Sequence, residues 1–156
     1  MAYKQVTLKV TKLIKAEPKM VYEYLFQIDK LKDWLGDKWY LIEPLVFDVN
    51  KPGQKISFRL KPPMKWFKFG FWFTNEVKEI KENQWIRGSV DGMVRGEFTW
   101  STETCKEGTI LSHEIRVAGT TFFNHLFFCM GINGHHSRYR RKMRYLCEIL
   151  EKQSRK

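Results

Sequence analysis

The sequence contains few cysteines, few prolines and no long apolar run. Its 156 residues include three cysteines and five prolines. The cysteines are odd in number, widely spaced and without a CxxC pair, which disfavours a disulfide-stabilised secreted domain and a zinc site and favours a reducing compartment. The longest apolar run, 126–132, is far shorter than the roughly 18 residues that a membrane-spanning helix needs. We therefore expect a cytoplasmic protein, without a signal peptide because the first residues include no apolar stretch.

Several catalytic and cofactor-binding motifs are also missing from the sequence. There is no GxGxxG, no Walker loop, no GxSxG elbow and no HExxH. His135 and His136 are adjacent, so their rings cannot share one helix face as two metal ligands spaced i and i+4 would. The sequence therefore predicts no bound metal and no nucleotide or other cofactor.

Aromatic side chains are abundant in the sequence. There are 12 Phe, 6 Trp and 6 Tyr, and 43% of the residues are hydrophobic while 29% are charged. This balance is typical of a soluble globular chain that buries a core, and the length fits a single domain over 1–156. No repeat, low-complexity stretch or linker divides the chain. We expect one domain whose core, or whose cavity, is built from rings.

The positive charge is concentrated at the end of the chain. The net charge is +11, and +6 of it lies within 135–156. Basic segments of this kind favour nucleic acid, an acidic membrane surface or phosphorylated ligands as partners, although a solvent-exposed helix face rich in arginine is the simpler explanation. The predicted anion-binding surface consists of Arg138, Arg141, Lys142 and Arg144.

The hydrophobic pattern changes its period twice along the chain. Residues 3–14 alternate as a half-buried strand, helical spacing follows Pro18, and a second short helix is expected over 30–35. The period is two from Trp39 onward and helical again after Gly119. Six further strands are predicted over 45–49, 56–60, 67–73, 84–90, 94–102 and 109–118. This order predicts an α+β fold in which a curved, antiparallel seven-stranded sheet surrounds a long C-terminal helix.

The order of elements and three local segments resemble the START-like superfamily, also called SRPBCC or the helix-grip fold. The segments are 10–22 (VTKLIKAEPKMVY), 96–100 (GEFTW) and 108–114 (GTILSHE). The superfamily includes birch pollen allergen-type proteins and polyketide cyclase/dehydrase-like proteins. The resemblance implies a hydrophobic cavity between the sheet and the last helix, which in members binds lipids, sterols, isoprenoids or aromatic polyketides. A minority are enzymes, and others are ubiquinone-binding chaperones or ribosome-associated factors, so the fold does not choose the function.

Rings on the alternating strands are the predicted cavity walls, unless they fill a solid core, which the sequence leaves equally open. His113 shares a strand face with apolar residues, and His136 lies on the apolar stripe of the last helix; each is alternatively a hydrogen-bonded core histidine. The predicted ligand-binding cavity is lined by Phe58, Phe69, Phe71, Phe73, Trp85, Phe98, Trp100, His113, Phe122, Phe127, Met130, His136 and Tyr139.

Three functions fit these features. The first is binding, transport or sequestration of a hydrophobic small molecule such as a lipid, an isoprenoid or an aromatic polyketide. The second is a cyclase/aromatase-type enzyme with His113 and His136 as an acid–base pair and Arg87 polarising a carbonyl. The third is an interaction module whose basic C-terminal helix contacts RNA, the ribosome or an acidic membrane. We favour binding over catalysis because no further catalytic partner of the histidines is identifiable; the oligomeric state stays open.

Overall fold

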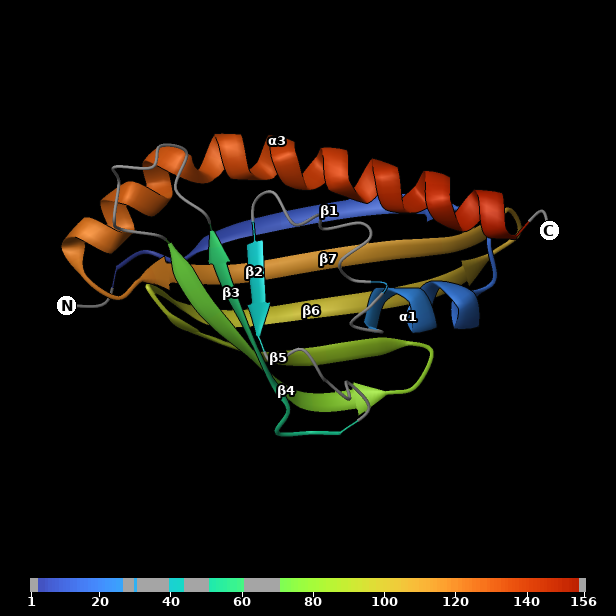
Figure 1. Cartoon of the computed structure of the whole chain (residues 1–156), viewed down its shortest axis with the longest axis horizontal. Helices are drawn as coiled ribbons and strands as arrows, with labels where there is room; N and C mark the ends of the chain where they lie inside the picture. The colour runs from blue at the N-terminus through green and yellow to red at the C-terminus, as the bar shows by residue number, and fades with distance from the viewer. Residues whose placement is uncertain (1–2, 27–29, 31–39, 44–50, 61–70, 155–156) are drawn as a thin grey trace.

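The structure is a computed structural model that describes residues 3–26, 30, 40–43, 51–60 and 71–154. Within these residues the chain forms one antiparallel sheet, a short helix and a long C-terminal helix (Figure 1). The predicted α+β class, with an antiparallel sheet and a helix at the end of the chain, is confirmed. No helix in this part of the chain is both long and apolar enough to cross a membrane.

The sheet has seven strands in the order β1-β7-β6-β5-β4-β3-β2. Consecutive strands pair as hairpins, except that β1 pairs with β7. Helix α1 spans Pro18–Phe26 and helix α3 spans Phe122–Gln153. The strands are β1 Val6–Ile14, β2 Tyr40–Glu43, β3 Lys55–Leu60, β4 Trp72–Lys81, β5 Trp85–Gly92, β6 Val94–Cys105 and β7 Gly108–Gly119.

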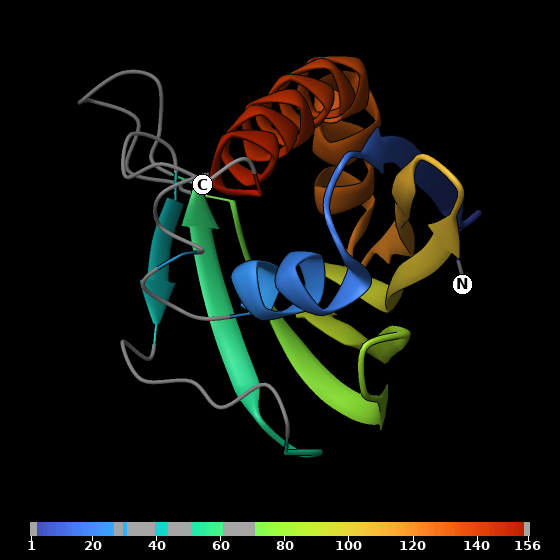
Figure 2. The same cartoon turned by 90° about the vertical axis from the view of Figure 1, so that its right-hand side faces the viewer.

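The sheet curls, and its concave face holds both helices. Helix α3 lies along β1 and β7, and α1 lies against β6 and β7 (Figures 1 and 2). Ile56 of β3 belongs to the same buried cluster as Val10 of β1 and Leu111 of β7, although three strands separate β3 from β7 in the sheet. The curvature therefore brings the two sides of the concave face together.

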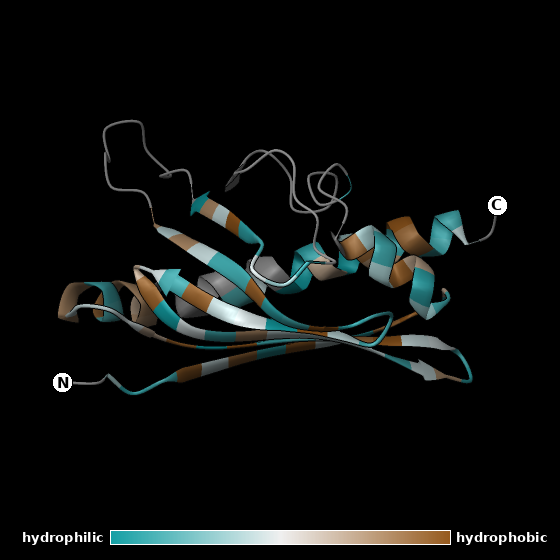
Figure 3. Cartoon of the chain, turned by 90° about the horizontal axis from the view of Figure 1, so that it is seen from below, coloured by the Kyte–Doolittle hydropathy of each residue, from teal (hydrophilic) through white to brown (hydrophobic). Residues whose placement is uncertain are grey.

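Two clusters of buried residues occupy this concave face. The helix cluster lies under the second half of α3, where Met143, Leu146 and Leu150 are fully buried at helical spacing, as expected for a helix after Gly119 with one apolar stripe. The sheet cluster lies on the central strands and includes Tyr22 of α1. Its other members are Val77, Ile86, Val90, Val94, Phe98 and Val117. Hydrophobic and hydrophilic residues alternate along the strands, as the banding in Figure 3 shows, and the buried members of this alternation lie on the concave face.

One predicted strand has different bounds in the structure, and the helix predicted after Gly119 starts at a capping residue. The strand predicted over 67–73 corresponds to β4, which extends to Lys81; a bulge between Val77 and Glu79 breaks the alternation there and hides the strand in the sequence. Helix α3 begins at Phe122, because the side chain of Thr121 caps it by accepting a hydrogen bond from the Asn124 amide.

Two further predicted elements cannot be compared with the structure. The short helix predicted over 30–35 lies outside the described residues except for Lys30, and the strand predicted over 45–49 lies wholly outside them.

Candidate functional site

Two pairs of stacked rings lie on the concave face. The ring centroids of Phe58 and Phe73 are 5.1 Å apart, and those of Trp100 and His113 are 4.1 Å apart. Phe58 and Phe73 are directly opposite each other in the β3–β4 ladder, and Trp100 and His113 in the β6–β7 ladder. Cross-strand register therefore creates both pairs. We call these four residues the ring site.

The ring site lies where the two buried clusters meet. Phe58 and Trp100 pack against the helix cluster, while Phe73 and Trp100 pack against the sheet cluster. The four rings have inward-facing neighbours that are almost fully buried, such as Ile56 at 6% exposure. The rings themselves stay partly exposed. Accessible apolar surface on a concave face is what a site for a hydrophobic ligand requires.

Asn75 adds a polar atom beside the ring site. It follows Phe73 by two residues on β4 and lies opposite Ile56 and Val90, so its side chain is on the concave face. Its Oδ1 is buried, and the described part of the chain offers it no hydrogen-bond donor. A buried acceptor without a donor costs about 1–3 kcal/mol, and a hydroxyl or N–H group of a ligand would remove that cost.

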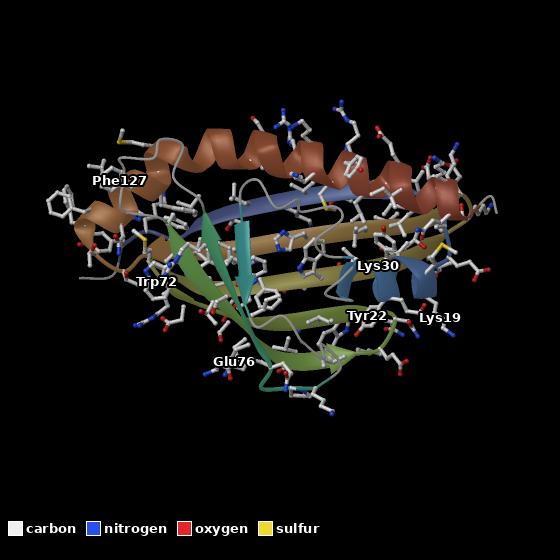
Figure 4. The ribbon with its side chains drawn as sticks, in the orientation of Figure 1. Lys19, Tyr22, Lys30, Trp72, Glu76 and Phe127 are labelled. Carbon is white, nitrogen blue, oxygen red and sulfur yellow. The ribbon has the colours of Figure 1, made fainter. Side chains whose placement is uncertain are left out.

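Tyr22 carries a second buried oxygen on this face of the sheet. The residue is 4% exposed and comes from α1 (Figure 4). Burial, with a smaller contribution from the Glu82 carboxylate, raises the pKa of its hydroxyl to about 12. The hydroxyl is therefore neutral at physiological pH and adds polarity without charge to the sheet cluster.

Several predicted wall residues do lie on the concave face. His113 is there, as its alternation with Leu111 and Val117 predicted, since both of these are fully buried. Phe71 stacks on Phe128 of α3 with ring centroids 6.3 Å apart. The predicted residues on this face are Phe58, Phe71, Phe73, Phe98, Trp100 and His113.

The prediction that Phe122, Phe127 and Met130 line a cavity is wrong. Their side chains are 60%, 57% and 72% exposed. They belong to the first turns of α3, where Phe128 is the residue that packs against the sheet cluster. Because a helix advances about 100° per residue, the turn that packs Phe128 against the sheet directs these three side chains to solvent. Their apolar character alone could not reveal this.

The assignment of Trp85 to the cavity and of Arg87 to catalysis is also wrong. Both belong to β5, where the alternate residues Ile86 and Gly88 are buried. Trp85 and Arg87 therefore lie on the outer face, and the Arg87 guanidinium sits 4.5 Å from the centroid of the Trp85 ring. Arg87 cannot reach a substrate that contacts His113 on the opposite face.

The remaining predicted residues lie on α3 or outside the described part of the chain. His136 is partly buried on α3, and Arg141 and Arg144 are exposed. Lys142 is partly buried and has a partner. Phe69 lies outside the described residues, as do the side chains of Arg138 and Tyr139.

Sequence reasoning missed Asn75. The residue lies in the part of β4 that was not predicted as a strand, so its face could not be assigned. An asparagine between Phe73 and Val77 on one face of a strand is the signal that would have identified it, because asparagine is uncommon in strands.

Comparison with known proteins identifies the fold. No family model and no curated protein matches the sequence. Protein CV1439 of Chromobacterium violaceum has a similar structure, with a TM-score of 0.69 and 16% identity over 94% of this chain and 98% of that one. The Aha1 dimer of Colwellia psychrerythraea gives a TM-score of 0.63 and 18% identity, over 94% of this chain and 96% of that one. At such low identity these similarities show the fold alone, and an antiparallel sheet with a C-terminal helix is compatible with a helix-grip fold.

Proposed function

We propose that this protein is a START-like (SRPBCC) domain that binds a hydrophobic small molecule at the ring site. The observation that carries the proposal is the partial exposure of Phe58, Phe73, Trp100 and His113 on a face where adjacent side chains are buried. A ligand that covered these rings would remove apolar surface from water, which is favourable in proportion to the area covered. Stacked rings also favour a planar or ring-bearing ligand.

The polar groups narrow the chemistry of this ligand. The Asn75 Oδ1 atom is an acceptor in need of a donor, so the ligand carries a hydroxyl or an N–H group. Within the ring site itself, the polar groups are the imidazole of His113 and the indole N–H of Trp100. An alcohol of lipid or isoprenoid type and a phenolic polyketide both combine a large apolar surface with such a donor.

Binding without chemistry is the reading that the side chains support best. The cyclase-type mechanism needs a group that polarises a carbonyl near His113, and Arg87, the residue assigned to that role, lies on the outer face over Trp85. Transport or sequestration of the ligand requires only burial and a hydrogen bond.

Two measurements test the proposal. Native mass spectrometry of the protein purified from its own host should reveal a co-purified hydrophobic molecule. Titration with the fluorescent apolar probe N-phenyl-1-naphthylamine should give saturable binding that W100L weakens about tenfold, since a lost ring contact of about 1.5 kcal/mol corresponds to that factor.

W85L is the matched control, because Trp85 lies on the outer face of the same sheet. It should leave probe binding unchanged, while circular dichroism verifies that both variants are folded. Equal effects of the two substitutions, or no saturable binding to the wild-type protein, would contradict the ring site as the binding surface.

A further inference from the structure

The start of α3 carries an apolar surface that faces solvent. Its exposed side chains have fractional exposures between 44% and 72%. We call this surface the apolar end, and its members are Phe122, Phe123, Leu126, Phe127 and Met130. Contiguous exposed apolar side chains of this size are uncommon on a monomeric soluble protein and indicate an interaction surface.

Trp72 lies at the same end of the molecule. Its side chain is 46% exposed, and Figure 4 shows it below Phe127 at this end. Phe71, the residue before Trp72, stacks on Phe128 of α3. The Thr120 hydroxyl just before the helix donates a hydrogen bond to the carbonyl of Gly92 on the neighbouring strand β5, and the Met93 amide after Gly92 donates one to the Trp72 carbonyl. The apolar end thus has a tryptophan beside it on a rigidly connected strand.

The second half of α3 presents cations on the same helix face. Arg140, Arg141 and Arg144 are exposed, and no ion pair within the described residues includes them. Each lies eighteen residues, or five full turns, beyond a member of the apolar end, so the two groups belong to the same stripe of the helix, which bends between them (Figure 1). Glu148, one turn after Arg144, is an acidic residue on this exposed face.

A single surface that satisfies both groups must be apolar inside and anionic outside. A bilayer containing anionic lipids has this structure: rings enter the boundary between headgroups and acyl chains, and arginines contact the phosphates. RNA phosphates could contact the arginines, and RNA bases could stack on the phenylalanines. RNA offers no apolar partner for Leu126 and Met130, whose side chains have no ring for a base to stack on. A second copy of this chain carries the same net charge of +11, so it would offer these arginines no excess of negative charge.

We propose that α3 docks this protein on anionic lipid bilayers, with the apolar end inserted and Arg140, Arg141 and Arg144 on the headgroups. This inference goes beyond ligand binding at the ring site and does not depend on it. A domain that binds a hydrophobic molecule at one site and a bilayer at another would exchange that molecule with the membrane.

Vesicle co-sedimentation of the full chain tests the docking. We expect the protein to sediment with vesicles of phosphatidylcholine mixed with phosphatidylserine and much less with phosphatidylcholine alone. Binding should fall as salt is raised, because the attraction to anionic headgroups is screened.

Ring and charge variants separate the two contributions. F123S combined with F127S should weaken partitioning about tenfold for each ring removed. The matched control is L13S, since Leu13 is 40% exposed on the outer face of β1, opposite the face that buries Ile14 and that α3 covers, and it should leave partitioning unchanged. R140E combined with R144E should abolish the preference for phosphatidylserine. K81E combined with K106E alters the net charge equally at exposed strand ends and should reduce binding far less.

Several results would overturn the proposal. One is no sedimentation with the mixed vesicles at low salt. Another is a ring variant that binds as well as the wild type, which would reduce the interaction to surface charge alone. A third is a dimer in sedimentation velocity that F127S dissociates, because a second copy would then cover the apolar end.

Discussion

The indole of Trp100 stacks on the imidazole of His113, with ring centroids 4.1 Å apart and ring planes inclined by 29°. The two residues face each other in the β6–β7 ladder, so the contact is fixed by strand register rather than by a loop. Such a pair offers a flat surface with one polar edge. A ligand with a ring system and a donor group matches this surface on both counts.

A double-mutant cycle measures this stacking. We expect W100L and H113L to destabilise the protein non-additively, with a coupling free energy of about 0.5–1.5 kcal/mol, the range found for aromatic pairs. Urea unfolding of the wild type, both single variants and the double variant gives the value. Additive free energies would show that the two rings touch without stabilising each other.

We expect Asn75 to lower the stability of the free protein and to raise its affinity for a hydroxyl-bearing ligand. Replacing it in N75L removes a buried acceptor without a donor and places an apolar side chain between Ile56 and Val90. We expect the free energy of unfolding to rise by about 1–2 kcal/mol and the affinity for a hydroxyl-bearing ligand to fall. Urea unfolding and ligand titration check the two effects.

T74V, on the same strand, is the control, and its effect on the free energy of unfolding should have the opposite sign to that of N75L. The Thr74 hydroxyl shares a 2.9 Å hydrogen bond with Ser57 on the outer face. Its loss should lower stability by about 1 kcal/mol and leave ligand affinity unchanged. A destabilised N75L would mean that the Asn75 oxygen is satisfied in the free protein.

Because Gly88 has no side chain, the ring of Phe98 can pack against the backbone at this position. A Cβ atom there would collide with the backbone oxygen of Glu76 and would lie 2.5 Å from the Phe98 ring. We expect G88A to lower the free energy of unfolding by about 3 kcal/mol, because a buried strand and a ring must move. S89A, on the outer face, should change it by less than about 0.5 kcal/mol in the same thermal or urea unfolding measurement. A G88A variant as stable as S89A would argue against this close packing.

The cysteines should react with iodoacetamide in order of their exposure. Cys129 is exposed on α3, Cys105 is intermediate and Cys147 is buried. Burial also raises the pKa of the Cys147 thiol to about 11, so this residue is protonated at neutral pH. Mass spectrometry of peptides after timed labelling should show Cys129 modified first and Cys147 only when urea unfolds the protein. Early modification of Cys147 would contradict its place in the helix cluster.

The fold could be predicted from the sequence because the hydrophobic patterns that indicate its strands and its last helix are local. Alternation places His113 on the inner face of β7, and helical spacing places Met143, Leu146 and Leu150 under α3. The wrong assignments have two different causes. Trp85 was assigned to the cavity because it is a large ring, although its alternation with Ile86 places it on the outer face beside Arg87. Phe122 lies in a helix whose contact with Phe71, the residue before β4, no sequence period encodes.

The candidate site was predictable only in part, for a related reason. The residues of the ring site were selected because they are rings on alternating strands, yet the pairing of Phe58 with Phe73 depends on strand register. The sequence also could not distinguish a filled core from accessible rings, since partial exposure is decided by how the sheet curls around both helices.

Stability should fall in alkaline solution in two overlapping steps, which single substitutions distinguish. The folded pKa of Cys147 is raised from 9.0 to about 11, so the stability it contributes is complete below pH 9 and is lost as the pH rises through 11. Tyr22 acts in the same direction one unit higher, because burial raises its pKa from 10.0 to about 12. Urea unfolding at a series of pH values should show a slope between 9 and 10 that C147A removes, a slope between 11 and 12 that Y22F removes, and a slope between 10 and 11 that each variant reduces. If either variant kept the slope of the wild type, the group responsible would lie elsewhere, and the burial of that side chain would not be what limits stability in alkali.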